Sequence, residues 1–345
     1  MKKGCPFGTH RVLEPAGVLP QPAWKLDNTM DIYDNEILID VEVLNIDAAS
    51  FSQIEEASGQ DLERIKEIIL ETVAKRGKQH NPVTGSGGML MGRVAQIGPA
   101  LEGKNDLKVG DKLATLVSLS LTPLKIEEIK AVYPEKDQLA ITGKAILFES
   151  GIYAKLPGDL PERLALAVFD VAGAPAQTAK LVRPGDTVVV IGGGGKSGLM
   201  CLQEAKKRAG VTGRVIGLGH GERDCGRMAE LGAADLIVRG NAADAVEVYK
   251  LIKDATGGKL ADVIINCVNI PGTELASIMA TREGGTVYFF SMATGFTAAA
   301  LGAEGLGKDI NMLIGNGYTR GHAEIALQVV REAPRLRAIL EKMFG

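Results

Sequence analysis

The sequence predicts an α/β protein of two domains, a strand-rich module followed by a doubly wound parallel sheet. The chain has 345 residues, which is enough for two domains at roughly 150 residues each. Short strand patterns dominate up to about residue 157. From about residue 158, strands, tight turns and helices alternate, which is the rhythm of right-handed crossovers in a parallel sheet.

The first module is expected to contain at least three strands and one helix. Residues 37–44 alternate between inward and outward positions, as in a half-buried strand. A second strand pattern covers 89–97, and 107–117 is typical of a turn followed by a strand. Residues 62–75 place apolar side chains on one helical face and charged side chains on the other. The helix therefore lies between the first two strands.

The second module begins with a continuous apolar run at 187–191, as expected for a parallel strand buried on both faces. Further strands are expected at 214–218, 235–238, 262–267, 285–291 and 309–315. Helices are expected between them, and two more near 325–330 and 336–343, packed on the first module or on the sheet edge. The uncharged stretch 284–303 approaches the length of a membrane span, but its glycines and hydroxyl groups favour a buried strand followed by a loop.

Charge and cysteine content narrow the class of protein. The chain has 39 Lys and Arg against 42 Asp and Glu, and no basic run, which argues against nucleic acid or an anionic membrane as a partner. The four cysteines lie apart along the chain, a spacing that suits a reducing cytosol. The N-terminus lacks the apolar segment of a signal peptide. We therefore expect a cytoplasmic protein.

The strongest motif is IGGGGKSG at 191–198, which follows a buried strand and opens a helix. Gly193-x-Gly195-x-x-Gly198 fits the dinucleotide fingerprint: the first glycine makes the turn, the second admits the pyrophosphate, and the third allows close helix–strand packing. A phosphate-binding P-loop would need glycine at position 190, which is Val190. The predicted cofactor contacts in this loop are Gly193, Gly194, Gly195, Lys196, Ser197 and Gly198.

The choice between NAD and NADP stays open. An NAD site usually has Asp or Glu at the end of the second strand, where it binds the ribose 2′-hydroxyl. This chain has Gly219 there, followed by His220 and Arg223, which could attract a 2′-phosphate. Arg223 could equally be a solvated residue at a helix start.

The stretches LKVGDKLA (107–114), LVRPGDTVVVIGGGGKSG (181–198), AELGAADLI (229–237) and GGKLADVIINCV (257–268) resemble the medium-chain dehydrogenase/reductase superfamily. The resemblance implies a GroES-like barrel catalytic domain over 1–157, completed by 301–345, and a Rossmann domain over 158–300. It also implies an active site between the domains, a cofactor contact at Val268, and a homodimer.

The zinc ligands of that superfamily are missing. Asp47 stands where zinc-dependent members have their first cysteine, and Gly88 and Met89 stand where they have His and Glu. Catalytic zinc needs three protein ligands. We therefore expect catalysis without a metal.

Three further stretches, 2–24, 79–99 and 217–237, resemble the family of L-erythro-3,5-diaminohexanoate dehydrogenases. The resemblance implies NAD(P)-dependent oxidative deamination at C3 of a small diamino acid in lysine fermentation. Two alternatives stay open: a zinc-independent quinone or enone oxidoreductase, and a non-catalytic NADP(H)-binding protein.

The deamination chemistry needs a group that takes a proton from the substrate ammonium and donors for the substrate carboxylate. Each candidate also has a structural interpretation. Asp47 could cap a turn, Glu55 could be a solvated acid at a helix start, and His80 could be an ordinary loop residue. The candidate catalytic residues are Asp47, His80 and Glu55. The candidate substrate contacts are Ser50, Thr84, Ser86 and Arg11.

Overall fold

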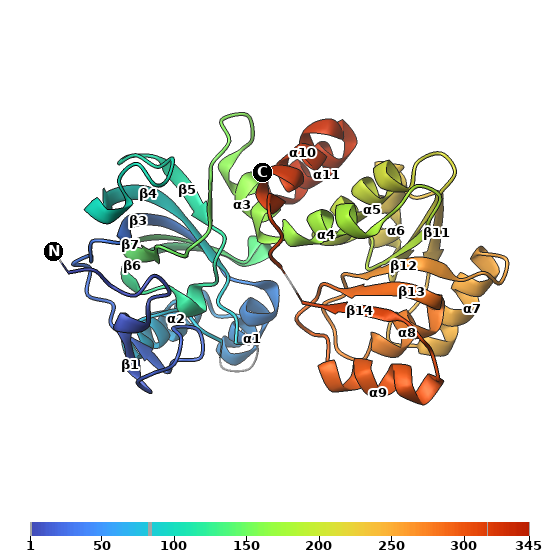
Figure 1. Ribbon diagram of the computed structural model, residues 1–345, viewed down its shortest axis with the longest axis horizontal. Helices are drawn as coiled ribbons and strands as arrows, with labels where there is room; N and C mark the ends of the chain where they lie inside the picture. Colours follow the sequence, from blue (N-terminus) through green and yellow to red (C-terminus); the bar gives the residue numbers. More distant parts are fainter. Residues whose placement is uncertain (1, 82–84, 316, 345) are drawn as a thin grey trace. The chain divides into compact units, whose positions relative to one another are not determined.

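The computed structural model describes residues 2–81, 85–315 and 317–344. The chain divides into two compact units, Met1–Asp170 and Val171–Gly345 (Figure 1). One unit is built on an antiparallel sheet and the other on a parallel sheet, so the predicted fold class is confirmed. Residues 158–170 lie with the first unit and 301–345 with the second. The division into a catalytic and a dinucleotide-binding domain at 157 and 300 stays a prediction.

The first unit holds a six-stranded sheet in the order β6-β7-β3-β4-β5-β8 and a small sheet of β1 and β2. The bounds are β1 Val12–Glu14, β2 Lys25–Leu26, β3 Glu36–Asn45, β4 Met89–Ile97, β5 Lys112–Thr115, β6 Leu124–Tyr133, β7 Gln138–Phe148 and β8 Tyr153–Lys155. The strands expected near 37–44, 89–97 and 107–117 are β3, β4 and β5. Strands β1, β2, β6, β7 and β8 were not expected from the sequence.

The first unit also contains helices. They are α1 (Ala48–Ser58), α2 (Leu62–Arg76) and α3 (Glu162–Asp170), with short 3-10 turns at Thr9–Arg11, Pro99–Leu101, Leu119–Leu121 and Pro134–Lys136. The predicted helix is α2, whose Ile65, Ile69 and Val73 are buried. A second helix, α1, was not expected, because only Phe51 and Ile54 point into the core among many small and polar residues.

The second unit holds six parallel strands in the order β11-β10-β9-β12-β13-β14. The bounds are β9 Thr187–Ile191, β10 Arg214–Gly219, β11 Leu236–Arg239, β12 Ala261–Asn266, β13 Thr281–Phe289 and β14 Asn311–Ile314. All six expected strands are present. The strand order reverses between β9 and β12, and ligands of such sheets bind at the carboxyl ends of the strands beside that reversal.

Helices lie on both faces of the parallel sheet. The bounds are α4 Gly173–Leu181, α5 Lys196–Ala209, α6 Glu222–Leu231, α7 Ala245–Ala255, α8 Glu274–Ala280, α9 Phe296–Leu306, α10 His322–Glu332 and α11 Pro334–Phe344. Figure 1 shows α4, α5 and α6 along one face and α7, α8 and α9 along the other.

One expectation for the second unit was wrong. The loop expected after β13 contains helix α9, because its alanine-rich run is helix-forming without a charged face. The C-terminal helices pack on other helices of the second unit: α10 contacts α4 and α5, and α11 contacts α6. Within the described residues, no helix is both long and apolar enough to cross a bilayer.

Candidate functional site

The glycine loop of the second unit is a tight turn between β9 and α5. Its left-handed residue is Gly192, with φ of 79°, a conformation that glycine adopts without strain. The backbone N–H groups of Gly192 and Gly193 both donate to the Leu218 carbonyl, at 2.9 and 3.0 Å. The turn is therefore fixed to the neighbouring strand β10. The residue that makes the turn is thus Gly192 and not, as was predicted, Gly193.

Gly195 and Gly198 have the surroundings that the fingerprint requires. A Cβ atom at Gly198 would lie 2.1 Å from the Gly192 carbonyl oxygen, so only glycine lets the start of α5 pack so closely on the turn. At Gly195, which is exposed, a Cβ atom would meet nothing closer than the Gly192 carbonyl oxygen at 3.7 Å. The space in front of Gly195 is open, as a backbone cradle for a pyrophosphate must be.

Gly193 and Gly194 are required by packing inside the unit. A Cβ atom at Gly193 would lie 2.5 Å from the Met228 sulfur, and one at Gly194 would lie 2.5 Å from the Asp224 backbone. Both glycines let the loop sit against α6. Their contribution to a cofactor site is thus to hold the loop in place.

The other predicted cofactor residues surround the loop. Lys196 opens α5, and its Nζ lies 5.2 Å from the centre of the Phe344 ring. Ser197 follows it at a half-buried position. Val268 lies next to the turn, since a Cβ atom at Gly192 would meet Val268 Cγ2 at 2.9 Å. These residues are brought together by the carboxyl ends of β9 and β12.

The residues expected to decide between NAD and NADP binding lie at the end of β10 and just after it. Gly219 is buried, while His220 and Arg223 are exposed. Two further residues here were not expected from the sequence. Arg227 Nη1 donates to the Gly194 carbonyl at 3.4 Å, and Asp224 packs against both Gly194 and Gly219. The spacing of these residues on α6 gives no signal, because the contacts depend on how α6 packs on the loop.

A buried polar network stabilises the end of β12. Asn266 Nδ2 donates to Thr273 Oγ1 at 2.8 Å and to Ser277 Oγ at 3.0 Å, and its Oδ1 accepts from the Val268 N–H at 3.0 Å. Asn266 is fully buried. The amide therefore orients the backbone at Val268, beside the glycine turn.

In the first unit, Asp47 is the N-cap of α1. Its Oδ1 accepts from the Ser50 N–H at 3.0 Å, and the Ser50 hydroxyl donates to Oδ2 at 2.6 Å. Both bonds hold the carboxylate in one orientation. Asp47 is half-buried and Ser50 is buried. The structure thus brings these two predicted site residues into direct contact.

The loop before β4 closes directly on Asp47. A Cβ atom at Gly88 would lie 2.0 Å from the Asn45 carbonyl oxygen and 2.8 Å from the Asp47 nitrogen. Asn81 Nδ2 donates to Gln53 Oε1 of α1 at 2.9 Å, and the Ser86 carbonyl accepts from the Asn81 N–H at 2.8 Å. Ser86 is therefore held in the loop that borders α1. Thr84 lies outside the described residues.

His80 lies in the same loop in an unusual environment. Burial lowers the pKa of His80 to about 4, and the positive charges of Arg76 and Lys78 contribute to the shift. Its Nδ1 is buried without a hydrogen-bond partner among the described residues. The imidazole is therefore neutral at pH 7, and a group with so low a pKa is a weak general base.

Lys78 was not singled out from the sequence. Burial lowers the pKa of Lys78 to about 7, and the charge of Arg76 adds to the shift. Its Nζ donates to the backbone carbonyls of Pro20 and Gln21, at 2.7 and 2.9 Å. These bonds attach the N-terminal segment to the loop that carries His80.

Arg11 does not have the role expected from the sequence. It is fully buried, and its guanidinium forms two bonds to Glu36, from Nε at 2.7 Å and from Nη2 at 2.6 Å. The Thr29 and Asp31 carbonyls accept its other N–H groups at 2.7 and 2.8 Å. Burial alone would raise the pKa of Glu36, but the bonds from Arg11 and Tyr33 outweigh it and lower that pKa. With its donors engaged inside the protein, Arg11 cannot hold a substrate carboxylate.

Glu55 also lies elsewhere than expected. It occupies the second half of α1, where its carbonyl accepts from Ser58 and Gln60. The helix-start interpretation is wrong, because the unexpected helix α1 begins seven residues earlier, at Ala48. Glu55 is half-buried, and its catalytic role stays a prediction.

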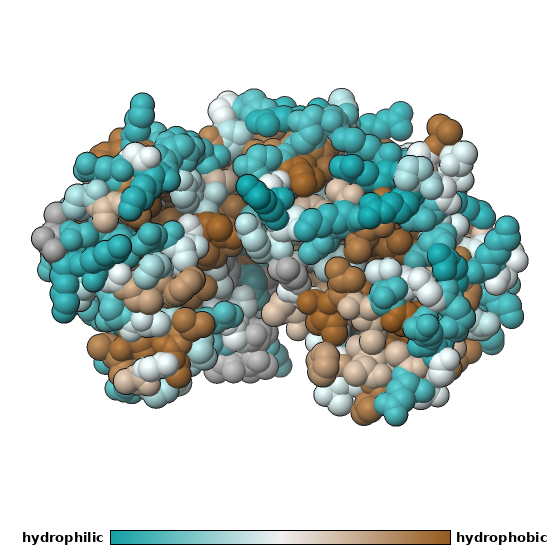
Figure 2. All heavy atoms as spheres, in the orientation of Figure 1, coloured by the Kyte–Doolittle hydropathy of each residue, from teal (hydrophilic) through white to brown (hydrophobic). Residues whose placement is uncertain are grey.

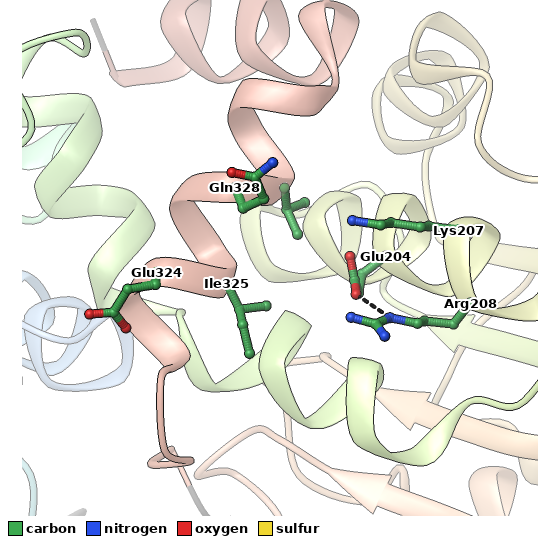
Figure 3. A pocket seen from close by; sticks show the side chains of 7 residues that line it. Glu204, Lys207, Arg208, Glu324, Ile325 and Gln328 are labelled. Atoms are coloured by element: carbon green, nitrogen blue, oxygen red, sulfur yellow. Dashed lines mark hydrogen bonds and ion pairs between the residues drawn. The ribbon is translucent and has the colours of Figure 1, made fainter.

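No group of three or more His, Cys, Asp or Glu side chains with metal-binding geometry occurs in the described part of the chain. A surface cavity of about 300 Å³ lies between α5 and α10, lined by Glu204, Lys207, Arg208, Glu324, Ile325, Gln328 and Val329 (Figure 3). Its charged groups pair locally, with Arg208 Nε 2.7 Å from Glu204 Oε1. None of the predicted site residues lines it.

Comparison with known proteins identifies the family. Residues 10–157 match the model of the L-erythro-3,5-diaminohexanoate dehydrogenase N-terminal domain, and 198–319 match that of a zinc-binding dehydrogenase. The L-erythro-3,5-diaminohexanoate dehydrogenase of Acetoanaerobium sticklandii is 61% identical over 342 residues, 99% of each chain. The chain belongs to the L-erythro-3,5-diaminohexanoate dehydrogenase family. The enzyme of that name from Fusobacterium nucleatum is 58% identical and covers 100% of both chains.

Solved structures outside the L-erythro-3,5-diaminohexanoate dehydrogenase family show the same fold. A mycobacterial protein solved with NADPH matches with a TM-score of 0.55 and 16% identity, over 89% of this chain and 81% of that one. An alcohol dehydrogenase from a Thermus species matches with a TM-score of 0.54 and 18% identity, over 91% and 87% of the two chains. Both support the medium-chain dehydrogenase/reductase architecture.

Proposed function

We propose that this chain catalyses NAD(P)-dependent oxidative deamination of L-erythro-3,5-diaminohexanoate at C3, which gives 5-amino-3-oxohexanoate and ammonia in lysine fermentation. The observation that carries the proposal is the identity of 61% over nearly the whole length of a dehydrogenase of that name. The open cradle at Gly195 and the close packing at Gly198 fit a nicotinamide dinucleotide. When bound, the nicotinamide supplies the acceptor for the hydride from C3.

The residues of the first unit prepare the substrate. The C3 ammonium must lose a proton before its nitrogen lone pair can assist hydride departure. Asp47 is suited to hold this ammonium, because its two bonds to Ser50 fix the carboxylate while leaving each oxygen a further lone pair. Ser50 thus acts as a positioning residue. Asp47 is a better candidate than His80 for holding the ammonium, since a carboxylate can pair with a cation, whereas burial lowers the pKa of His80 to about 4 and leaves its imidazole uncharged.

We infer that the reaction needs no metal. Asp47, at the position of a zinc ligand in related enzymes, is instead bonded to Ser50, and Gly88 and Met89 offer no ligand atoms of the Cys, His or acid type. Prolonged chelation is expected to leave turnover unchanged. A loss of activity that zinc alone restores would contradict this inference.

A substrate panel tests the function. The protein is incubated with NAD+ or NADP+ and the diamino acid, simple β-amino acids or alcohols, and with NADPH and enones or quinones, while nicotinamide absorbance and released ammonia are followed. We expect turnover with L-erythro-3,5-diaminohexanoate and ammonia in equal amount to reduced cofactor. Turnover of enones or quinones alone would indicate the alternative oxidoreductase, and cofactor binding without any turnover would indicate a binding protein.

We also propose a homodimer that works in the cytoplasm. The edge strand β14, helix α9 and the loop before α9 carry exposed apolar side chains, with Ile314 38%, Phe296 71%, Leu301 61% and Met292 59% exposed (Figure 2). An apolar patch beside an open sheet edge is typical of a self-association surface. Leu301→Arg should shift the protein to monomer in sedimentation velocity. Val211→Arg, at a fully exposed apolar residue on a turn, serves as the control and should leave the oligomeric state unchanged.

A further inference from the structure

A carboxylate lies beside the end of β10, although the sequence has none at the strand end itself. In dinucleotide sites of this fold, an acid at the end of the second strand accepts a hydrogen bond from the adenosine ribose 2′-hydroxyl. Here that position is Gly219. The nearest acid provided by the fold is Asp224, the third residue of α6.

Asp224 lies between the end of β10 and the glycine loop. A Cβ atom at Gly219 would lie 3.3 Å from Asp224 Cβ, and one at Gly194 would lie 2.5 Å from both Asp224 Cα and Cβ. Glycine at both positions therefore lets α6 bring the Asp224 side chain next to the loop that cradles the pyrophosphate. A side chain at position 219 itself would also meet Met228 Cε at 2.8 Å, so this strand end has little room for an acid of its own.

The Asp224 carboxylate does not cap helix α6. Gly221 is the N-cap of α6, and no side chain caps the helix there. Within the described ranges the Asp224 side chain makes no hydrogen bond or close ion pair, and it is half-exposed; its charge interacts with that of Arg227, three residues along α6.

The hydrogen bonds of Arg227 and Arg239 go to other groups, although the charge of Arg227 also interacts with that of Asp224. Arg227 Nη1 is directed to the Gly194 carbonyl at 3.4 Å, on the glycine loop. Arg239, at the end of β11, donates to the His220 carbonyl at 3.1 Å and pairs with Glu222 at 3.6 Å. Arg223 is exposed on α6. Asp224 is thus the charged group packed against Gly219.

We propose that Asp224 replaces the missing strand-end acid: it accepts a hydrogen bond from the adenosine ribose of the dinucleotide and repels a 2′-phosphate, so that the site selects NAD over NADP. The proposal rests on the proposed function, since it needs a nicotinamide dinucleotide at the glycine loop. It also reverses the expectation that His220 and Arg223 favour a 2′-phosphate.

Binding measurements without substrate test the proposal. Dissociation constants of NAD+, NADP+, ADP-ribose and 2′-phospho-ADP-ribose are measured by titration calorimetry on the full chain. Wild type should bind NAD+ more tightly than NADP+. Asp224→Asn and Asp224→Ser should each lower the ratio of the NADP+ to the NAD+ dissociation constant at least about tenfold, equivalent to about 1.4 kcal/mol. ADP-ribose and its 2′-phosphate should show the same change.

Glu222→Gln is the matched control, because Glu222 is an exposed acid in the same helical turn that pairs with Arg239. Its ratio should stay at the wild-type value. An unchanged ratio in both Asp224 variants, with melting temperatures near wild type, would overturn the proposal, as would tighter binding of NADP+ by the wild type. If the wild type bound neither dinucleotide, the proposed function would fail with it. Normal binding without deamination would contradict the proposed function alone.

Discussion

Asp47→Asn separates catalysis from helix capping at one position. The asparagine keeps the shape of the side chain, and its amide oxygen can still accept from the Ser50 N–H, which donates to Asp47 at 3.0 Å. It cannot hold an ammonium as an ion pair or take its proton. We expect kcat/KM for deamination to fall by about a hundredfold to ten-thousandfold, the usual effect of removing a general base.

The stability of the same variant should change little. Complete loss of an N-cap costs about 0.5–2 kcal/mol, and 1 kcal/mol corresponds to about 2–4 °C of melting temperature in a domain of 150–250 residues. Asp47→Ala should therefore lower the melting temperature by several degrees, whereas Asp47→Asn should preserve most of it. Turnover is followed by nicotinamide absorbance, and melting by calorimetry, on the same preparations.

Asp61 provides the matched control. It is the exposed N-cap of α2 and accepts from the Glu63 and Arg64 N–H groups at 2.9 and 3.3 Å. Asp61→Asn and Asp61→Ala should reproduce the melting changes and leave deamination intact. Near-normal deamination by Asp47→Asn would refute the reasoning. Asp47 would then be a structural cap, and Glu55 and His80 would be the next candidates for the base.

Three further outcomes follow from the geometry. Gly195→Val should abolish dinucleotide binding, measured by calorimetry, without lowering the melting temperature. Gly198→Val should weaken dinucleotide binding and also lower the melting temperature, because Gly198, unlike Gly195, packs against the turn. Glu36→Gln should cost about 3–5 kcal/mol of unfolding free energy in urea, since it removes the closer of the two carboxylates that pair with buried Arg11 and leaves Asp27 at 3.8 Å; a change below about 1 kcal/mol would contradict that role. Because the pKa of His80 is lowered to about 4 in the folded state, unfolded chains bind a proton first as the pH falls below about 6.5. The His80-linked stability is therefore present above pH 6.5 and is lost towards pH 4, by at most about 2 kcal/mol at pH 5; His80→Gln should lack this loss in urea unfolding at pH 7.5 and 5.

The parallel sheet could be predicted almost strand by strand. A strand buried on both faces needs a continuous apolar run, as at 187–191, and the following turn needs glycine where backbone approaches backbone. Such requirements involve residues close together in the chain, so they can be recognised in the amino-acid sequence. The antiparallel sheet was predicted less completely, because β6 carries charged side chains on its exposed positions and reads as a polar segment.

The candidate site was predicted in part. Asp47 and Ser50 were selected from one short stretch, and they do contact each other. Glu55 was assigned to the wrong part of a helix, because the periodicity of α1 is weak and its start is set by the Asp47 cap. Arg11 was taken for a substrate contact because a single sequence does not show that Glu36, 25 positions away, neutralises it inside the protein.

The sequence by itself determined the α/β class, the order of the strands along the second unit, and the glycine loop, because burial and backbone geometry restrict which residue types can follow one another. Only the tertiary structure decided which polar groups meet. It buried Arg11 against Glu36, turned Lys78 to the Pro20 carbonyl, and placed Asp224 beside Gly219. Contacts of this kind join residues from different elements, and their energy depends on distance and desolvation after packing, which no local pattern of residues encodes.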